Sequence, residues 1–515
     1  MRSSRVFALA LATPRLVLAQ CPDYSDYSQQ FHEPLSSGKY KLSYQRPAPR
    51  CRTFNSTGVE DVVKRMESVI KDPDLYRLFS NAYPNTLDTA IKWKGYAANN
   101  SAEELTFIIT GDINAMWLRD SANQMQSYLP LLNASNDPNS IASLYRGVIN
   151  LQARYLLTSP YCNSFQPPAE SKIPRAPNPS ASQDNVFPFY SNDFVFECKY
   201  ELDSLAAFLE VSANYYNATG DAAFFGKFSW VQAVETVLKV AEDMMTPTYG
   251  ADGQVLQSPY TFTRLTTRAT ETLANDGLGN PVANGTGLIR SAFRPSDDST
   301  IFQLFIPANM MFSTYLSSTA EIMSKLNTTG SGSLAQKMTS LSTSLRSAIE
   351  DQGTVNHAAH GKIYAFEIDG FGAQTIMDDA NIPSLLSAPF LGYPVDPSTY
   401  ANTRDFILSA TNPYFMRGPV INAVGGPHEG PGMAWPMASI EIVGELRQIL
   451  RSTAGLGLVH ESVNSFNETR WTRQWFSWAN GLFGQMILDL DKRKPETLLW
   501  ASATFLSCEA RLRVL

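Results

Sequence analysis

The chain has 515 residues and a formal net charge of −7; 44% of its residues are hydrophobic and 11% are aromatic. This composition is typical of a soluble globular protein with a large core. No long basic run or stripe occurs, so we expect neither a nucleic acid nor an anionic membrane as partner. An acidic, aromatic-rich chain favours an enzyme that acts on a neutral substrate.

The N-terminus is typical of an exported protein. Residues 1–19 combine Arg2 and Arg5 with an apolar stretch and a Val17-Leu18-Ala19 triplet, which predicts a signal peptide despite the interruption at Pro14. Sequons for N-glycosylation begin at Asn55, Asn99, Asn133, Asn217, Asn284, Asn327 and Asn467. Together these features predict a secreted or secretory-pathway glycoprotein of a eukaryote. Beyond the leader, no apolar run is long enough to cross a membrane.

Cysteine is scarce in this chain. The five cysteines allow at most two disulfides and leave one thiol, and the sequence leaves their pairing open: Cys21, Cys51, Cys162, Cys198 and Cys508. The protein is therefore not a scaffold held together by disulfides.

Helical periodicity is the commonest pattern along the chain. Apolar residues recur on one stripe in six stretches, and each predicts an amphipathic helix: 62–70, 141–155, 202–209, 230–238, 334–349 and 475–485. Alternation with period two is rare and short, as at residues 362–369. The sequence thus predicts an all-α protein whose paired helices form a toroid.

Two long connections stand out between these helices. Residues 163–190 are rich in Pro, Ser and Asn, and residues 246–292 are rich in Thr, Gly and Asn. Loops of this length in a compact domain are usually functional or disordered. We expect an N-terminal extension at 20–50, a single catalytic domain at 51–495 and an atypical basic tail at 496–515.

The stretch "GDINAMWLRDSANQM", residues 111–125, gathers polar groups around a tryptophan. Carboxylate and amide pairs bind adjacent sugar hydroxyls while an aromatic ring stacks on the C–H face, so Asp112, Trp117 and Asp120 favour a carbohydrate site. The alternative is a buried Arg119–Asp120 ion pair that anchors a helix.

The stretch "NDFVFECKYELDSL" carries charged residues where a helix is expected to begin. Glu197, Lys199, Glu201 and Asp203 alternate with apolar residues there. A binding role and a structural role are both compatible with this pattern, because acidic residues in a first helical turn interact favourably with the helix dipole.

The stretch "SAFRPSDDST", residues 291–300, holds two adjacent aspartates. Ser296 is a suitable N-cap, so we expect a helix that begins at Asp297. Beside Asp298 and the apolar segment that follows, the carboxyl of Asp297 should have a raised pKa. Such a group can donate a proton as a general acid.

Two later stretches complete the candidate site. "GPHEGPGMAWPM" contains His428 and Trp435 among glycines that allow close approach of a ligand to the backbone. The segment from "HES" to "TRQWFSWANGLFG" contains Glu461, the best candidate for an opposing base, although a surface salt bridge of His460 and Glu461 is the alternative.

The sequence lacks the motifs of metal and cofactor chemistry. His357 and His360 have no suitable third ligand, and no zinc motif, phosphate loop, dinucleotide fingerprint or Gly-x-Ser-x-Gly elbow occurs. We therefore expect no metal and no cofactor. Paired carboxylates with many tryptophans then favour glycoside hydrolysis.

The quoted stretches, together with "YAFEIDGFGAQTIMDDANIPSLL", resemble the motifs of glycoside hydrolase family 125, in order from about residue 55 to 490. The resemblance implies an (α/α)6 toroid and an exo-α-1,6-mannosidase that inverts the anomeric centre without a catalytic metal. The substrates it implies are α-linked mannosides, as oligosaccharides or glycans.

The resemblance also implies roles for particular residues. The general acid is Asp297, with Asp298 as the alternative, since related toroidal trehalases show an Asp-x-Ser spacing like that of Asp297 and Ser299. The general base is Glu461. The implied sugar-binding residues are Trp117, Arg119, Asp120, Asn123, Arg294, Asp298, His428, Trp435 and Trp475.

Other functions remain open at this point. A toroidal hydrolase with another sugar or linkage, a carbohydrate-binding homologue without catalysis and a polysaccharide lyase are the alternatives; a lyase would need a basic groove for uronates. The oligomeric state and the natural substrate are not determined by the sequence.

Overall fold

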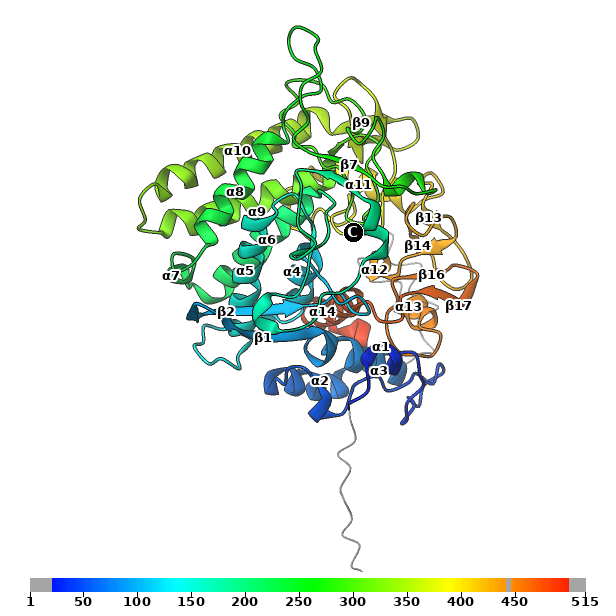
Figure 1. Ribbon diagram of the computed structural model, residues 1–515. Helices are drawn as coiled ribbons and strands as arrows, with labels where there is room; N and C mark the ends of the chain where they lie inside the picture. The colour runs from blue at the N-terminus through cyan, green and yellow to red at the C-terminus, as the bar shows by residue number, and fades with distance from the viewer. Residues whose placement is uncertain (1–20, 441–445, 500–515) are drawn as a thin grey trace, which may run out of the picture.

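The computed structural model describes residues 21–440 and 446–499 (Figure 1). The predicted leader at 1–19, Cys508 and most of the predicted tail lie outside the described residues. Helices dominate the described part of the chain, and the bounds of the α-helices are α1 Tyr24–Tyr27, α2 Thr57–Val69, α3 Pro73–Ala82, α4 Leu118–Gln126, α5 Ile141–Thr158, α6 Leu202–Thr219, α7 Ala222–Phe225, α8 Trp230–Asp243, α9 Ile306–Lys325, α10 Ser331–Gln352, α11 Pro397–Ile407, α12 Pro436–Ile440, α13 Leu446–Ser452 and α14 Ser477–Arg493.

All six stretches with helical periodicity form helices, namely α2, α5, α6, α8, α10 and α14. The strands are short and form antiparallel sheets of two or three strands each. Their bounds are β1 Ile91–Ala97, β2 Asn100–Ile108, β3 Met116–Trp117, β4 Ser164–Phe165, β5 Asn185–Phe187, β6 Val195–Glu197, β7 Thr261–Thr263, β8 Leu304–Phe305, β9 Thr354–His357, β10 Gly361–Tyr364, β11 Glu367–Ile368, β12 Gln374–Thr375, β13 Phe415–Met416, β14 Ala423–Val424, β15 Met433–Ala434, β16 Ser462–Asn464 and β17 Asn467–Thr472.

Four helices form a continuous inner series. α14 packs on α4, α4 on α6 and α6 on α9, while α3, α5 and α10 pack against this series from outside (Figure 1). All nine residues of α4 are buried, including its polar ones. Only Leu118, Ala122 and Met125 among its nine residues are apolar, so the helical periodicity of α4 is a weak signal in the sequence.

The two long connections contact each other in the folded chain. β5, from the first connection, pairs with β7, from the second, so that Val186 lies opposite Phe262. The first connection also contributes β4, which lies between β3 and β6. A disulfide joins Cys162 to Cys198 at the two ends of this region. The long connections are therefore ordered and belong to the same end of the molecule as the start of α4.

The N-terminal segment at 21–50 packs against the helical core. A disulfide joins Cys21 to Cys51, Tyr24 packs edge-on against Trp475, and Arg46 forms a buried ion pair with Asp88 at 2.7 Å. These contacts tie the predicted extension to the region that contains α3 and α14.

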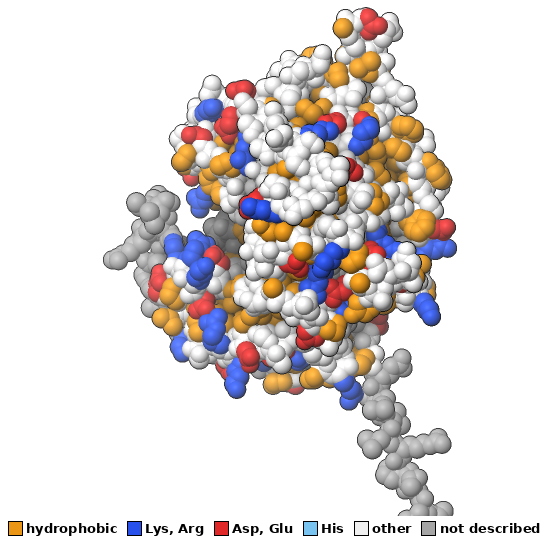
Figure 2. Space-filling model, turned by 90° about the vertical axis from the view of Figure 1, so that its left-hand side faces the viewer, with side chains coloured by type: hydrophobic (Ala, Val, Ile, Leu, Met, Phe, Trp, Pro, Cys, Tyr) orange, Lys and Arg blue, Asp and Glu red, His pale blue; other side chains and the backbone are white. Residues whose placement is uncertain are grey.

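The outer surface agrees in two respects with the sequence patterns. The asparagines of all seven sequons are exposed. On the face shown in Figure 2, basic and acidic side chains are interspersed. None of the described helices is long and apolar enough to cross a membrane.

Candidate active site

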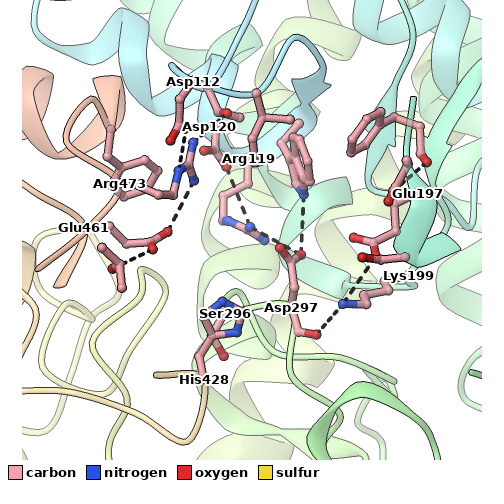
Figure 3. A pocket seen from close by; sticks show the side chains of 18 of the residues that line it. Asp112, Arg119, Asp120, Glu197, Lys199, Ser296, Asp297, His428, Glu461 and Arg473 are labelled. Carbon is pink, nitrogen blue, oxygen red and sulfur yellow. Dashed lines mark hydrogen bonds and ion pairs between the residues drawn. The ribbon is translucent and has the colours of Figure 1, made fainter. Parts of the chain in front are cut away.

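A cavity of about 620 Å³ opens where the N-terminal ends of α4, α12 and α14 meet the long connections (Figure 3). Its volume lies in the range of small-molecule sites. Seven of the eleven residues predicted from the sequence line it, namely Trp117, Arg119, Asp120, Asp297, His428, Trp435 and Glu461. Segments from residue 110 to residue 478 thus converge on one space.

Asp297 lies in a tight turn, and the expected helix at this position is wrong. The backbone N–H of Asp297 donates to the carbonyl of Arg294 at 2.9 Å, and Arg294 N–H donates to the carbonyl of Asp298 at 2.7 Å. The hydroxyl of Ser296 contacts the Asp379 carboxylate at 3.2 Å instead of capping a helix. The next helix, α9, begins only at Ile306, after β8.

The backbone of Asp297 adopts a left-handed conformation with φ 63°. A non-glycine residue in this region carries steric strain of about 1–2 kcal/mol. The surrounding contacts therefore hold this carboxyl in a set orientation at the edge of the cavity.

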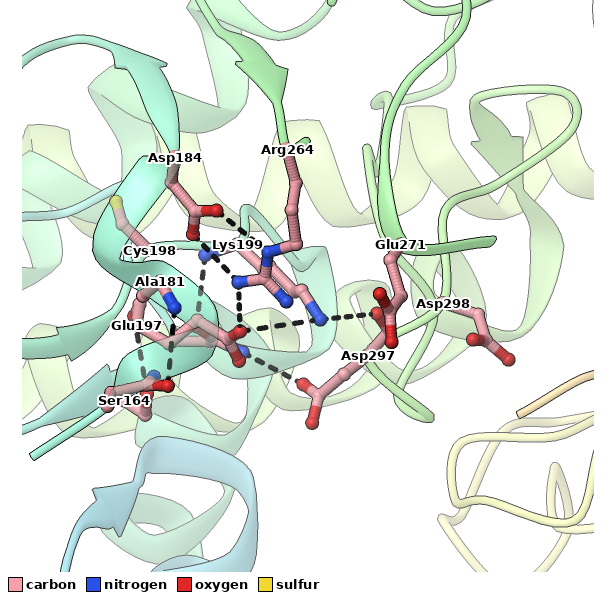
Figure 4. Close-up of polar contacts among 12 residues, drawn as sticks. Ser164, Ala181, Asp184, Glu197, Cys198, Lys199, Arg264, Glu271, Asp297 and Asp298 are labelled. Carbon is pink, nitrogen blue, oxygen red and sulfur yellow. Dashed lines mark hydrogen bonds and ion pairs between the residues drawn. The ribbon is translucent and has the colours of Figure 1, made fainter. Parts of the chain in front are cut away.

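Three polar contacts hold Asp297. Its Oδ1 accepts hydrogen bonds from Asn163 Nδ2 at 3.0 Å and from Trp117 Nε1 at 3.4 Å, and its carbonyl accepts one from Lys199 Nζ at 2.8 Å (Figures 3 and 4). Burial alone would raise the pKa of Asp297, but the Lys199 ammonium and the Arg119 guanidinium outweigh it and lower the pKa to about 2. The expected raised pKa at this residue is therefore wrong.

Asp298, unlike Asp297, does not line the cavity. It is buried, and its Oδ1 lies 3.4 Å from Nδ1 of His428. Burial disfavours the His428 imidazolium, but the Asp298 carboxylate raises the pKa of His428 to about 9, with Glu461 and Asp297 adding to the effect. Asp298 thus orients His428, which lines the cavity.

Glu461 is buried immediately before β16, so the surface salt bridge considered for it is excluded. Its Oε2 accepts a hydrogen bond from Thr472 at 3.0 Å, and its Oε1 lies 3.3 Å from Nη1 of Arg473. Arg473 is fixed in turn by Asp112 at 2.7 Å and Thr110 at 2.9 Å. These donors fix the position of the Glu461 carboxyl.

Asp297 and Glu461 approach the cavity from opposite sides, with Asp120 and Arg119 above the space between them in Figure 3. Burial raises the pKa of Asp120 to about 6, although the Arg119 and Arg473 guanidinium groups oppose the shift. A buried carboxyl with few donors is suited to accept hydrogen bonds from ligand hydroxyls.

Several buried donors in the cavity wall have no partner among the described residues. They are the indole N–H groups of Trp435 and Trp478, the side-chain amide of Asn381 and Nε of Arg119. An unsatisfied buried donor costs about 1–3 kcal/mol.

Four predicted binding residues do not line the cavity. Trp475 donates its indole N–H to Asn85 at 3.1 Å and packs on Tyr24, so its ring lies elsewhere. Arg294 is buried against Glu367 at 2.6 Å, and Asn123 donates to the carbonyl of Arg119 at 2.9 Å. Asp298 is likewise absent from the cavity lining. The structure therefore does not support the prediction that these four residues contact the sugar.

Several residues that line the cavity were not predicted from the sequence as binding residues. Arg264, from the second long connection, forms ion pairs with Asp184 at 2.7 Å and with Glu197 at 2.6 Å, and Lys199 lies 3.6 Å from Glu197 (Figure 4). Phe196, Asn381 and Trp478 also line the cavity. Asn381 and Trp478 stand within the family-like stretches, whereas Arg264 lies in a loop without any motif.

The charged side chains of the site pair with one another. Within residues 21–440 and 446–499, no three His, Cys, Asp or Glu side chains are grouped as metal ligands. Arg119, Arg473 and Lys199 neutralise the carboxylates instead. This arrangement suits proton transfer between carboxyls and a neutral ligand.

Comparison with known proteins agrees with this chemistry. Residues 72–488 match the model of the family described as metal-independent alpha-mannosidase, GH125. The chain is 45% identical over 491 residues to the meiotically up-regulated gene 157 protein of Schizosaccharomyces pombe, covering 93% of this chain and 94% of that protein.

A solved structure is similar over most of the chain. It is a metal-independent alpha mannosidase of Streptococcus pneumoniae in a non-productive complex with alpha-1,6-mannobiose, described in connection with the processing of N-linked glycans. It has 31% sequence identity and a TM-score of 0.72, and the match covers 85% of this chain and 98% of that one.

Proposed function

The chain belongs to the metal-independent alpha-mannosidases of family GH125, and from this premise we propose that it is an inverting exo-α-1,6-mannosidase. It releases terminal mannose from α-linked oligosaccharides or glycans. The proposed scaffold is the (α/α)6 toroid, and the proposed location is the secretory pathway. The mechanism proposed below uses neither a metal nor an organic cofactor.

One observation carries the proposal. Asp297 and Glu461 line the same cavity from opposite sides. Two carboxyls that flank one sugar-sized space are the requirement for hydrolysis of a glycosidic bond. The α-1,6-mannobiose in the similar bacterial structure supports a mannoside as ligand.

Sugar recognition falls to the cavity wall. Asp120 accepts hydrogen bonds from mannose hydroxyls, and Trp435 and Trp478 line the wall beside it. Trp117 lies beside Asp297 and offers an aromatic face. Closing the cavity with a sugar removes water and strengthens these contacts.

The chemical step uses the two carboxyls in different roles. Asp297 protonates the glycosidic oxygen as the bond to the anomeric carbon breaks and positive charge develops on the ring. Glu461 removes a proton from a water molecule on the opposite face, and that water attacks the anomeric carbon. Room for this water requires the carboxyls to lie roughly 6.5–9.5 Å apart, and the product is β-mannose.

Isomeric disaccharides test the proposal. Incubation with α-1,6-mannobiose should release mannose much faster than incubation with the α-1,2 or α-1,3 isomer. Proton NMR of the first product should show the β-anomer. Release of α-mannose would exclude inversion, and preference for a different isomer would exclude the proposed linkage. If no isomer releases mannose, the protein is not a hydrolase of these disaccharides, and sugar binding without catalysis is the alternative.

A further inference from the structure

Residues 176–184 of the first long connection form a strap along one wall of the cavity. The first five of them, from Ala176 to Ser180, line the cavity. Pro177, Pro179 and Ser180 are also exposed to solvent. A segment that is exposed and also lines a cavity separates that cavity from solvent, so the position of the strap sets the space behind it.

Two side chains hold the strap at its start. Nε2 of the buried Gln166 donates to the carbonyl of Ala176 at 3.0 Å, and Oε1 of Gln166 accepts from the N–H of Ala176 at 2.9 Å. Nδ2 of Asn178 donates to the carbonyl of Phe196 at 3.1 Å. Because Gln166 follows β4 and Phe196 lies in β6, the start of the strap is fixed to the sheet that carries Trp117.

Arg264, from the second long connection, holds the strap at its end. Its Nε and Nη2 donate to the two carboxylate oxygens of Asp184, each at 2.7 Å (Figure 4). The side chain of Asp184 has no exposed area, and that of Arg264 is 6% exposed. Two parallel hydrogen bonds from one guanidinium fix the orientation of a carboxylate as well as its distance. Arg264 therefore clamps one long connection to the other.

The same guanidinium extends the clamp toward the proposed general acid. Nη2 of Arg264 also donates to Glu197 at 2.6 Å, and Glu197 lies 3.6 Å from Lys199. Lys199 Nζ in turn donates to the carbonyl of Asp297 at 2.8 Å. The strap and the turn that holds Asp297 thus belong to one connected wall.

This wall lies where the proposed reaction places the leaving group. In Figure 3, Glu461 lies on one side of Asp297, and Lys199 and Glu197 lie on the other. The acid of an inverting glycosidase protonates the leaving oxygen, while the base activates water on the opposite face of the ring. The leaving group therefore extends past Asp297 and away from Glu461, toward the clamped wall.

The lining of this wall suits a second sugar ring. Pro177, Pro179 and Phe196 offer apolar surface to the C–H face of a sugar, and Ser180 offers a hydroxyl. The ring of Phe196 packs edge-on against Trp117, with centroids 5.4 Å apart. A ring that leaves past Asp297 would meet the strap, whereas a leaving group as small as methanol would not reach it.

We propose that Arg264 determines specificity for the leaving sugar: through its fork to Asp184 it holds the strap against the second ring of the substrate. Arg264 acts through the strap and is therefore a positioning residue. This inference rests on the function proposed above and adds the part of the chain that selects the leaving group.

Replacement of Asp184 by asparagine tests the clamp with two substrates. α-1,6-Mannobiose has a second ring, whereas methyl α-mannoside releases methanol. Both leaving oxygens need a proton, so a defect in the acid would slow both reactions. In the full-length chain, Asp184→Asn should lower kcat/KM for mannobiose by about tenfold, chiefly through a higher KM, and change that for methyl α-mannoside by less than about twofold.

Two further variants keep the test open if Asp184→Asn does not fold. Gln166→Met removes the anchor at the other end of the strap without changing any charge. Arg264→Lys keeps a positive charge beside Glu197 but cannot form the fork. Both should reproduce the selective loss for mannobiose.

Asp193→Asn is the matched control. Asp193 forms an exposed ion pair with Arg175, which directly precedes the strap, and neither residue lines the cavity. Exposed ion pairs contribute little, so both substrates should keep their wild-type kinetics. Equal losses for the two substrates in the clamp variants, or no loss for mannobiose, would overturn the proposed role of Arg264.

Binding measurements separate this inference from the proposed hydrolysis. A wild-type chain that cleaves neither substrate would overturn the hydrolase, but calorimetry would still test the strap. Asp184→Asn should then raise the Kd of mannobiose by about tenfold and leave that of methyl α-mannoside unchanged. Equal changes in the two Kd values would overturn the strap's selection of the second ring.

Discussion

The two carboxyls proposed for catalysis are held by different kinds of donor. Asp297 accepts neutral N–H groups at its carboxylate and a lysine at its backbone carbonyl, whereas Glu461 accepts a threonine hydroxyl and an arginine. The arginine and the threonine fix the orientation of the Glu461 carboxyl, as a base that must face its water requires.

Glu461→Gln should abolish turnover while leaving mannoside binding nearly intact. The amide keeps the size and the contact with Thr472 but cannot take a proton from water. We expect kcat for α-1,6-mannobiose to fall by about 10²–10⁴, with the dissociation constant of mannobiose measured by calorimetry changed little. Glu468→Gln, exposed on β17 of the same hairpin, is the control. A Glu461→Gln enzyme with the wild-type kcat would remove Glu461 from the mechanism.

His460 predicts a pH dependence of stability. It is buried and stacks on Trp471 with ring centroids 4.5 Å apart, and burial lowers its pKa to about 4. The unfolded residue titrates near pH 6.5, so its contribution to stability is present above that pH and is lost as the pH falls toward 4. The shift corresponds to about 3 kcal/mol.

His460→Phe isolates this contribution. The variant keeps an aromatic ring on Trp471 but cannot titrate, so the stability of the wild type should fall relative to the variant between pH 6.5 and 4. Tm values of both proteins across this range measure the effect. Carboxyls with raised pKa, such as Asp120, act in the opposite direction but equally in both proteins. A Tm difference that is constant with pH would contradict the prediction.

At the scale of elements, helix ends and loops build the site together. α4, α12 and α14 direct their N-terminal ends at the cavity, and the two long connections close its side through the β5–β7 pair. Asn163 follows Cys162, and Lys199 follows Cys198, so the disulfide between these cysteines lies beside two of the three residues that hold Asp297.

Removal of the Cys162–Cys198 disulfide should therefore reduce activity as well as stability. The double serine variant should lose about 2–4 kcal/mol of stability from loop entropy. It should also lose about tenfold to hundredfold in kcat, because displacement of a catalytic group is costly. Tm and mannobiose kinetics measure both effects.

The Cys21–Cys51 disulfide supplies the comparison. It joins the N-terminal segment to the region before α2. Its double serine variant should lower Tm but leave kcat near the wild-type value. Equal kinetic loss in both double variants would show that the effect is general destabilisation and not the position of Asp297.

At the scale of the whole molecule, the cavity joins distant parts of the chain. Gly111 pairs with Phe476 in a β-bridge, and Asp112 forms an ion pair with Arg473 at 2.7 Å. A Cβ at Gly111 would lie 2.2 Å from the Trp475 carbonyl oxygen, and its φ of 138° excludes most side chains. The N-terminal and C-terminal halves therefore meet closely at the floor of the site.

The exposed sequons predict glycosylation over the surface of the molecule. The chain produced in a eukaryotic secretory host should carry N-glycans at several of the seven exposed asparagines. Treatment with an N-glycosidase should lower its mass, and peptide mapping should locate the sites. Thr469→Ala, which removes the sequon of Asn467, should lose one glycan. A secreted chain without any glycan would contradict the prediction.

Much of the fold followed from local patterns. The six periodic stretches form helices because each buries one face, a property that neighbouring residues determine. The helix expected at Asp297 does not form, because Ser296 bonds to Asp379 and the turn is closed by Arg294. Two tryptophans near the start of α14 also show that local sequence does not determine which side chain faces the site. Trp478 lines the cavity, but Trp475 packs on Tyr24.

The sequence by itself determined which residues are proposed for the chemistry: the family-like stretches contain both Asp297 and Glu461, and the cavity is lined by both. Only the tertiary structure decided their surroundings. Lys199, Arg119 and Asn163 reach Asp297 from 98 to 178 positions away along the chain, as 297 − 199 and 297 − 119 give. Electrostatic interactions act through space, so the protonation of a buried carboxyl depends on contacts that no local pattern encodes.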